Sequence, residues 1–236
     1  MLVECATHAI LGACIGACAR EEFKLYKRLL PKLDASMLCL ADRGFRGHSR
    51  WVAARATGAE LLWRARTTQI LTPQAVLPDN SFLSQLVPGT GRREQRRSQG
   101  VTVRVIDYEL ANAQGEPTAY RLVTSLMDWA AAPAHELAQL YHARWQVEAV
   151  FDELKTHLRQ SRRVLRSKTP DLVRQEFYGW VLAHYAVRWL LHQSVSRHKL
   201  KHAEQSFIAH VNIRRSALPQ SGAFPLAAPT KKALLV

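Results

Sequence analysis

Acidic residues are scarce in this sequence. Its 236 residues include 19 Asp and Glu against 33 Lys and Arg, which gives a formal net charge of +14 at pH 7 with histidine neutral. Such an imbalance points to an acidic partner. Nucleic acid is the most common one, because cations that neutralise backbone phosphates release condensed counterions. An anionic membrane surface is the competing interpretation.

Long hydrophobic runs are also missing. The longest apolar stretch, residues 177–191, is interrupted by His184 and Arg188 and is shorter than the roughly 20 residues that a spanning helix needs. It predicts a buried helix, and no membrane association is expected. Met1 is followed directly by the strand-like segment 2–5, without a basic leader or a cleavage site, so we expect a cytoplasmic protein.

Cysteine is rare and forms no CxxC pair, which argues against a zinc or disulfide framework and favours reduced, buried thiols. The four cysteines are Cys5, Cys14, Cys18 and Cys39. Hydrophobic residues make up 47% and charged residues 22%, which excludes wholesale disorder and a fibrous chain. This length favours one domain, or one domain with a large insertion.

The first 66 residues alternate between strand and helix patterns and predict the first part of an α/β core. Residues 1–19 indicate two adjacent strands, with a helix as the alternative that periodicity leaves open, and 20–33 a short helix that ends near Pro31. The apolar run 37–41 is typical of a strand buried on both faces, as in a parallel sheet, and Asp42 follows its carboxyl end. A helix over 49–58 and a strand over 60–66 complete this part.

Residues 67–120 contain several prolines and an alternating run, 101–106, and predict a β-rich insertion. A core strand follows over 120–126, within a last structured region of 121–215. One helical block is expected from Pro133 to about Arg163, and another from Pro170 to about Arg197, with Thr169 as its cap. Residues 216–236 are rich in Ala, Pro and Ser and predict a flexible tail.

The first of these helices presents a stripe of polar residues. At about 100° per residue, four side chains fall together along the border of an apolar face: Tyr141, Arg144, Glu148 and Lys155. A carboxylate there would be half removed from water and would lie beside cations able to bind phosphate. The same spacing also fits an ordinary helix border on which Glu148 and Arg144 form an i, i+4 ion pair.

The pattern Tyr141-x2-Arg144-x3-Glu148-x6-Lys155 resembles the Y-R-E-K signature of DDE-class transposases of the bacterial insertion-sequence-four family. Upstream, residues 40–45 (Leu-Ala-Asp-Arg-Gly-Phe) resemble the segment around that family's second catalytic aspartate. The two motifs occur in the family's order, with a β-rich stretch between them. The resemblance covers nearly the whole chain.

This resemblance implies a ribonuclease-H-like fold in which Asp42 and Glu148 are two of three carboxylates that bind Mg²⁺ or Mn²⁺. Such a site activates water and then a DNA 3′-OH for attack on a phosphodiester, which cleaves transposon ends and joins them to target DNA. The resemblance also implies DNA contacts by Tyr141, Arg144 and Lys155, a homodimer on DNA, and association with the bacterial nucleoid.

One feature departs from the family. Its first aspartate lies on the opening strand of the fold, upstream of the segment that residues 2–5 resemble, whereas no aspartate precedes Asp34 here. We therefore expect an amino-terminally truncated transposase, with the first core strand missing and the chain itself inactive. The alternatives are a catalytically inactive DNA-binding remnant and a basic structural or ribonucleoprotein-associated domain.

A basic cluster follows the signature helix and is expected to contact DNA phosphates, although a solvated face is the simpler alternative. It consists of Arg159, Arg162, Arg163, Arg166 and Lys168. Three tryptophans in helical apolar patterns are expected in the core: Trp145, Trp180 and Trp189.

Overall fold

The structure is a computed structural model that describes residues 1–16, 22–45, 47–89, 99–111, 115–158, 167–198, 207–209 and 211–212. It divides into two compact units. The first unit comprises Met1–Cys5 and Leu11–Gln146, and the second comprises Ala6–Ile10 and the chain from Val147 onward. The predicted tail, 216–236, lies outside the described residues.

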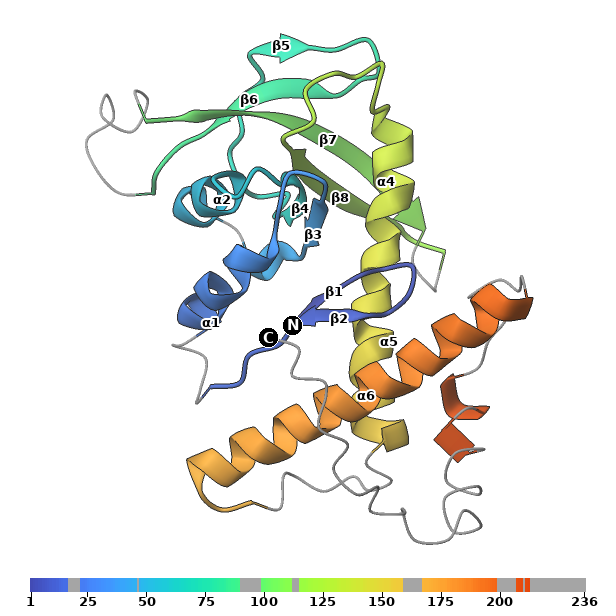
Figure 1. Cartoon of the computed structure of the whole chain (residues 1–236). Helices are drawn as coiled ribbons and strands as arrows, with labels where there is room; N and C mark the ends of the chain where they lie inside the picture. Colours follow the sequence, from blue (N-terminus) through green and yellow to red (C-terminus); the bar gives the residue numbers. More distant parts are fainter. Residues whose placement is uncertain are drawn as a thin grey trace, which may run out of the picture. The chain divides into compact units, whose positions relative to one another are not determined.

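The first unit is built on a six-stranded sheet with the strand order β3-β4-β8-β7-β6-β5 (Figure 1). The strands are β3 (Leu38–Ala41), β4 (Glu60–Ala65), β5 (Ala75–Val76), β6 (Phe82–Leu86), β7 (Val101–Ala111) and β8 (Pro117–Thr124). β3 and β4 run parallel, with Leu40 beside Leu62. The helix α2 (His48–Arg55) connects them, as a parallel pair requires a crossover. The predicted strand and its parallel pairing are confirmed, but its full burial is not: β3 is the edge strand of the sheet, and of its four residues only Ala41 is buried, while the other three are half-buried.

The strands expected between residues 67 and 120 extend this same sheet. β8 pairs with β4 on one side and with β7 on the other, and both pairings are antiparallel. The β-rich character of the region is thus confirmed, and its strands are continuous with the core sheet. The domain boundaries at residues 66 and 120 stay a prediction.

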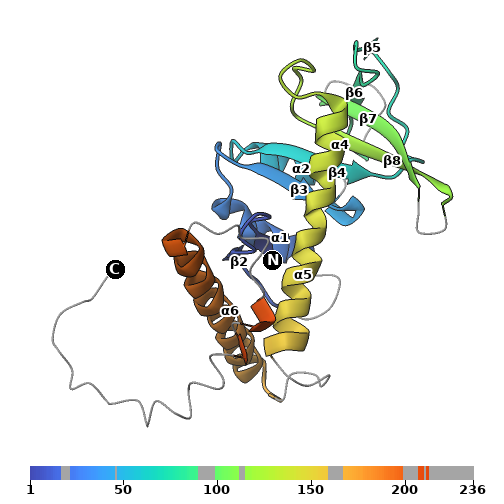
Figure 2. The same cartoon turned by 90° about the vertical axis from the view of Figure 1, so that its right-hand side faces the viewer.

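Side chains on the two faces of this sheet enter different cores, because successive residues of a strand point to opposite faces. On β4, Leu61 and Trp63 pack with residues of α2 and of α1 (Glu22–Leu29). Leu62 instead packs with residues of α4 (Ala134–His142). The helix α4 runs along the sheet in both views (Figures 1 and 2). The sheet is therefore covered by helices on both faces.

The opening segment forms a two-stranded sheet of β1 (Leu2–Val3) and β2 (Ile10–Gly12). Two adjacent strands were expected here, and they are confirmed but shorter than predicted. Of the four cysteines, Cys5, Cys14 and Cys39 are free and half-buried, while Cys18 lies outside the described residues.

The second unit contains most of α5 (Gln146–Asp152), a π-helix (Glu153–Leu158) and the long helix α6 (Pro170–His198). The predicted start of α6 is confirmed, since it begins at Pro170 and the backbone N–H of Leu172 donates to Oγ1 of Thr169 at 3.4 Å. Leu191 packs with Phe207 and Val211 in a small core.

The expected burial of α6 is wrong for one of its sides. Leu182 is 67% exposed and Trp189 is 51% exposed. The helix α6 has apolar side chains on all sides, so packing along one face cannot bury all of them. Trp145 is likewise 58% exposed, which corrects the prediction that it belongs to the core. Trp180 is half-buried.

Candidate active site

Asp42 lies where the sequence predicted, directly after the last residue of β3. It precedes a 3-10 turn over Arg43–Phe45. Its Oδ1 accepts the backbone N–H of Arg43 at 2.7 Å, and its main-chain carbonyl accepts the N–H of Phe45 at 2.9 Å. The side chain is half-buried, and Oδ2 has no hydrogen-bond partner among the described residues. This oxygen is thus available to bind a cation.

Tyr141 packs beneath this strand end. It lies in the last turn of α4, is 3% exposed, and donates its hydroxyl to the carbonyl of Ala41 at 3.3 Å. Burial raises the pKa of the Tyr141 phenol well above its usual range; the charge of Asp42 adds to this effect, and the charges of Arg144 and Arg64 oppose it. The phenol is therefore neutral. The predicted contact of Tyr141 with DNA stays a prediction.

Arg144 lies one turn beyond Tyr141, in a 3-10 turn over Ala143–Trp145. Its guanidinium carbon is 5.8 Å from the ring centroid of Tyr141 and 5.6 Å from that of Trp145, within cation–π range. Its Nε is buried and has no hydrogen-bond partner among the described residues. A planar cation with an unused donor is suited to gripping a phosphate.

Arg64 is a residue that sequence reasoning missed. It lies on β4, and its guanidinium carbon is 4.3 Å from the ring centroid of Tyr120. Tyr120 stacks in turn on Tyr108, with ring centroids 5.3 Å apart. Burial and the neighbouring Tyr120 raise the pKa of Tyr108 to about 12. Charge at one position of an alternating strand is common, so nothing in the sequence singled out Arg64.

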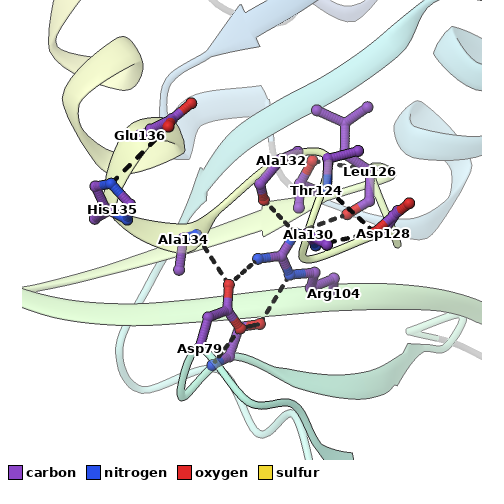
Figure 3. Close-up of polar contacts among 12 residues, drawn as sticks. Asp79, Arg104, Thr124, Leu126, Asp128, Ala130, Ala132, Ala134, His135 and Glu136 are labelled. Atoms are coloured by element: carbon purple, nitrogen blue, oxygen red, sulfur yellow. Dashed lines mark hydrogen bonds and ion pairs between the residues drawn. The ribbon is translucent and has the colours of Figure 1, made fainter.

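A buried ion pair fixes the start of the helix that carries Tyr141 (Figure 3). Arg104 is fully buried on β7 and pairs with Asp79 from the β5–β6 turn. The carboxylate of Asp79 accepts the first backbone N–H of α4, from Ala134, at 2.9 Å, and Arg104 donates to the carbonyl of Ala132 at 2.7 Å. Asp79 thereby caps α4 from a distant part of the chain.

Glu148 and Lys155 belong to the second unit, whereas Asp42 belongs to the first. Both side chains are exposed, Glu148 on α5 and Lys155 in the π-helix. The ammonium of Lys155 lies 5.0 Å from the ring centroid of Phe151. The uniform count of about 100° per residue does not hold along this segment, because a 3-10 turn winds more and a π-helix winds less per residue.

The basic cluster lies mostly outside the described residues. Only Lys168 falls within them, and it is exposed; the others are Arg159, Arg162, Arg163 and Arg166. The part of the chain that the structure describes holds no group of three or more His, Cys, Asp or Glu residues able to bind a metal ion. No helix in that same part is long and apolar enough to cross a membrane.

Comparison with known proteins identifies the family. Residues 2–186 match the family described as "Transposase DDE domain". The transposase InsG for insertion sequence element IS4, from Escherichia coli (strain K12), is 27% identical over 191 residues, which cover 79% of this chain and 42% of that protein. The chain therefore spans less than half the length of this curated relative. The resemblance found in the two motifs is confirmed, and the chain belongs to the DDE transposase domain family.

Proposed function

We propose that this chain is part of the catalytic core of a transposase of the insertion-sequence-four group, with a ribonuclease-H-like fold. In its complete form the enzyme would cleave transposon ends and join their 3′-OH to target DNA. The observation that supports this most directly is the placement of Asp42 directly after β3, where the Tyr141 hydroxyl donates to the carbonyl of the preceding residue, Ala41. The ring of Tyr141 in turn lies within cation–π range of the Arg144 guanidinium.

Asp42 and Glu148 are proposed as two of the carboxylates that hold Mg²⁺ or Mn²⁺. Hard oxygen donors suit these ions, and the open Oδ2 of Asp42 and the exposed carboxylate of Glu148 fit that role. The bound metals would supply activation of water and of a 3′-OH for in-line attack on a phosphodiester. The protein's own residues would hold the two carboxylates in place.

The cations of the chain would hold the DNA. Arg144 and Arg64, each stacked on a tyrosine ring, can donate to phosphate oxygens near Asp42. Lys155 and Lys168 would add point charges to the backbone contact, together with the arginines of the basic cluster. The partners proposed are transposon ends and target DNA, bound by a homodimer. The alternative is an inactive DNA-binding remnant that keeps these cations.

One experiment distinguishes a transposase core that cuts DNA from an inactive DNA-binding remnant. Mg²⁺-dependent nicking of plasmid DNA is measured for this chain and for a version extended with the upstream coding sequence. We expect the extended version to cut and its Glu148→Gln variant to lose cutting while it keeps its DNA affinity. Cutting by Glu148→Gln would contradict the metal role of Glu148. DNA binding without nicking in either version would favour the inactive remnant.

Salt-dependent binding to duplex DNA tests the basic structural domain as an alternative. The affinity of a transposase core should fall in Arg144→Ala and in Lys155→Ala. Affinity that is insensitive to both substitutions would instead indicate a general basic surface.

A further inference from the structure

Glu153 is a buried carboxylate that no role above explains. It opens the π-helix and is 8% exposed. Nε2 of His184 donates to Oε2 at 2.7 Å, and Nε of Arg188 donates to the same oxygen at 3.2 Å. A second nitrogen of Arg188 donates to Oε1, and Nδ1 of His8 lies 3.2 Å from Oε1. Both carboxylate oxygens are therefore used.

The partners of Glu153 come from separate segments of the second unit. His8 lies in Ala6–Ile10, while His184 and Arg188 lie one turn apart on α6. The ring of Phe207 covers this cluster, at 5.2 Å from the ring centroid of His184 and 5.0 Å from the guanidinium carbon of Arg188. Nη2 of Arg188 also lies 2.7 Å from Nδ1 of His8, and that nitrogen either donates to Glu153 or accepts from Arg188, depending on the tautomer of the ring. We call these four polar residues the Glu153 network.

The charges of the Glu153 network support one another. Burial alone would raise the pKa of Glu153, but hydrogen bonds from His184 and His8 and the charge of Arg188 lower it to about 2. Glu153 is thus an anion at neutral pH. A buried ion pair is costly to break, because removal of one partner leaves the other charged and desolvated. The π-helix is consequently tied to α6 at this residue.

The position of Glu153 in the chain is the informative point. It lies two residues before Lys155 and five residues after Glu148, both of them exposed residues of the proposed site. The bonds that hold the buried side chain of Glu153 restrict the orientation of this turn, and with it the directions in which the neighbouring side chains point. Short π-helical stretches within α-helices occur frequently at functional sites.

We propose that Glu153 is a positioning residue, whose bonds to His184, Arg188 and His8 hold the π-helix so that Lys155 is presented to DNA phosphate and Glu148 to the metals. This inference rests on the proposed function. Glu153 itself touches neither DNA nor metal; it acts through Lys155 and Glu148.

The test measures the affinity of the full chain for duplex DNA in Glu153→Gln and, as a matched control, in Asp152→Asn. Each variant removes one negative charge from the same helical segment, and Asp152 is exposed. Simple electrostatics predicts slightly tighter binding for both, since the net charge rises equally. If Glu153 has the positioning role, only Asp152→Asn should bind DNA more tightly. Glu153→Gln should lose affinity for duplex DNA by about five-fold or more.

A double-mutant cycle with Lys155→Ala identifies the route of this loss. If Glu153 acts through Lys155, Glu153→Gln should weaken binding little further once Lys155 has been removed. Additive losses in the double variant would overturn the proposal. If Lys155→Ala weakens binding but Glu153→Gln does not, the positioning role fails alone. No loss in Lys155→Ala also overturns the positioning role, and no loss in either Lys155→Ala or Arg144→Ala overturns the proposed function itself.

A second variant protects the test against a general loss of structure. Arg188→Lys keeps the charge but loses the forked contact with Glu153. In Glu153→Gln and in Arg188→Lys, amide hydrogen exchange measured without DNA should become faster across residues 147–158. It should stay unchanged across β4 and β8. Unchanged exchange across 147–158 in both variants would overturn the proposal without any reference to DNA binding.

Discussion

The hydroxyl of Tyr141 donates to the main-chain carbonyl of Ala41, the residue directly before Asp42, across 3.3 Å. This bond joins the end of α4 to the end of β3, so the signature helix and the aspartate segment are linked within one unit. The tyrosine of the signature thus has a structural task at the base of the proposed site, in addition to any contact with DNA.

Replacement of Tyr141 by phenylalanine should lower the free energy of unfolding by about 1 kcal/mol, because the buried carbonyl of Ala41 loses its hydrogen bond. Urea denaturation measures this change. Tyr185→Phe is the control, since Tyr185 is 54% exposed and its loss should change stability by much less. Equal effects of the two substitutions would show that the bond adds no stability.

Loss of Arg144 should reduce the dependence of DNA affinity on salt. If its guanidinium contacts one phosphate, Arg144→Ala should lower the slope of log affinity against log salt by about 1. Binding measured at several salt concentrations gives the slope. Arg174→Ala is the control, because Arg174 is exposed and pairs with Asp171 on α6. A slope that stays the same in Arg144→Ala would argue against this phosphate contact.

The buried pair of Asp79 and Arg104 should be far more important for stability than the pair of Asp107 and Arg121 on the same sheet. Asp79→Asn leaves Arg104 charged and fully buried, which should cost about 3 kcal/mol or more. The side chain of Asp107 is 44% exposed, so Asp107→Asn should cost about 1 kcal/mol or less. Urea denaturation of both variants compares them, and similar losses would contradict this ranking.

Glu153 should make the second unit sensitive to acid. Its pKa is lowered from 4.5 to about 2, so the unfolded chain binds this proton more readily than the folded chain. The stabilisation is therefore complete above pH 4.5 and is lost as the pH falls from 4.5 toward 2. Denaturation at several pH values should show this decline in the free energy of unfolding of the wild type, and a shallower decline in Glu153→Gln. Asp152→Asn should keep the wild-type decline.

Local patterns predicted the elements around Asp42 well. The continuous apolar run before Asp42 forms a strand with apolar contacts on both faces, as such a sequence favours, although as the edge strand it is only half-buried. The cap at Thr169 and the proline at 170 likewise placed the start of α6, since these residues satisfy or tolerate the open N–H groups of a helix end.

The helix wheel was less reliable over longer distances. It assumed uniform α-helical winding, whereas the segment from Tyr141 to Lys155 contains a 3-10 turn and a π-helix. It also assigned Trp189 to the core. Whether a side chain on a long helix is buried depends on which segments pack against that helix, and periodicity contains no information about them.

The sequence by itself determined the family, the order of the two motifs, the charge that suits DNA, and the strand that ends at Asp42. These features depend on residue types at short spacing, where local sterics and hydrophobic pattern decide. Only the tertiary structure decided that Tyr141 is buried against Ala41, that Arg64 stacks on Tyr120, and that Glu153 is held by His184 and Arg188. Such contacts join residues far apart in the chain, and their energies come from burial and charge pairing that exist only once the chain has folded.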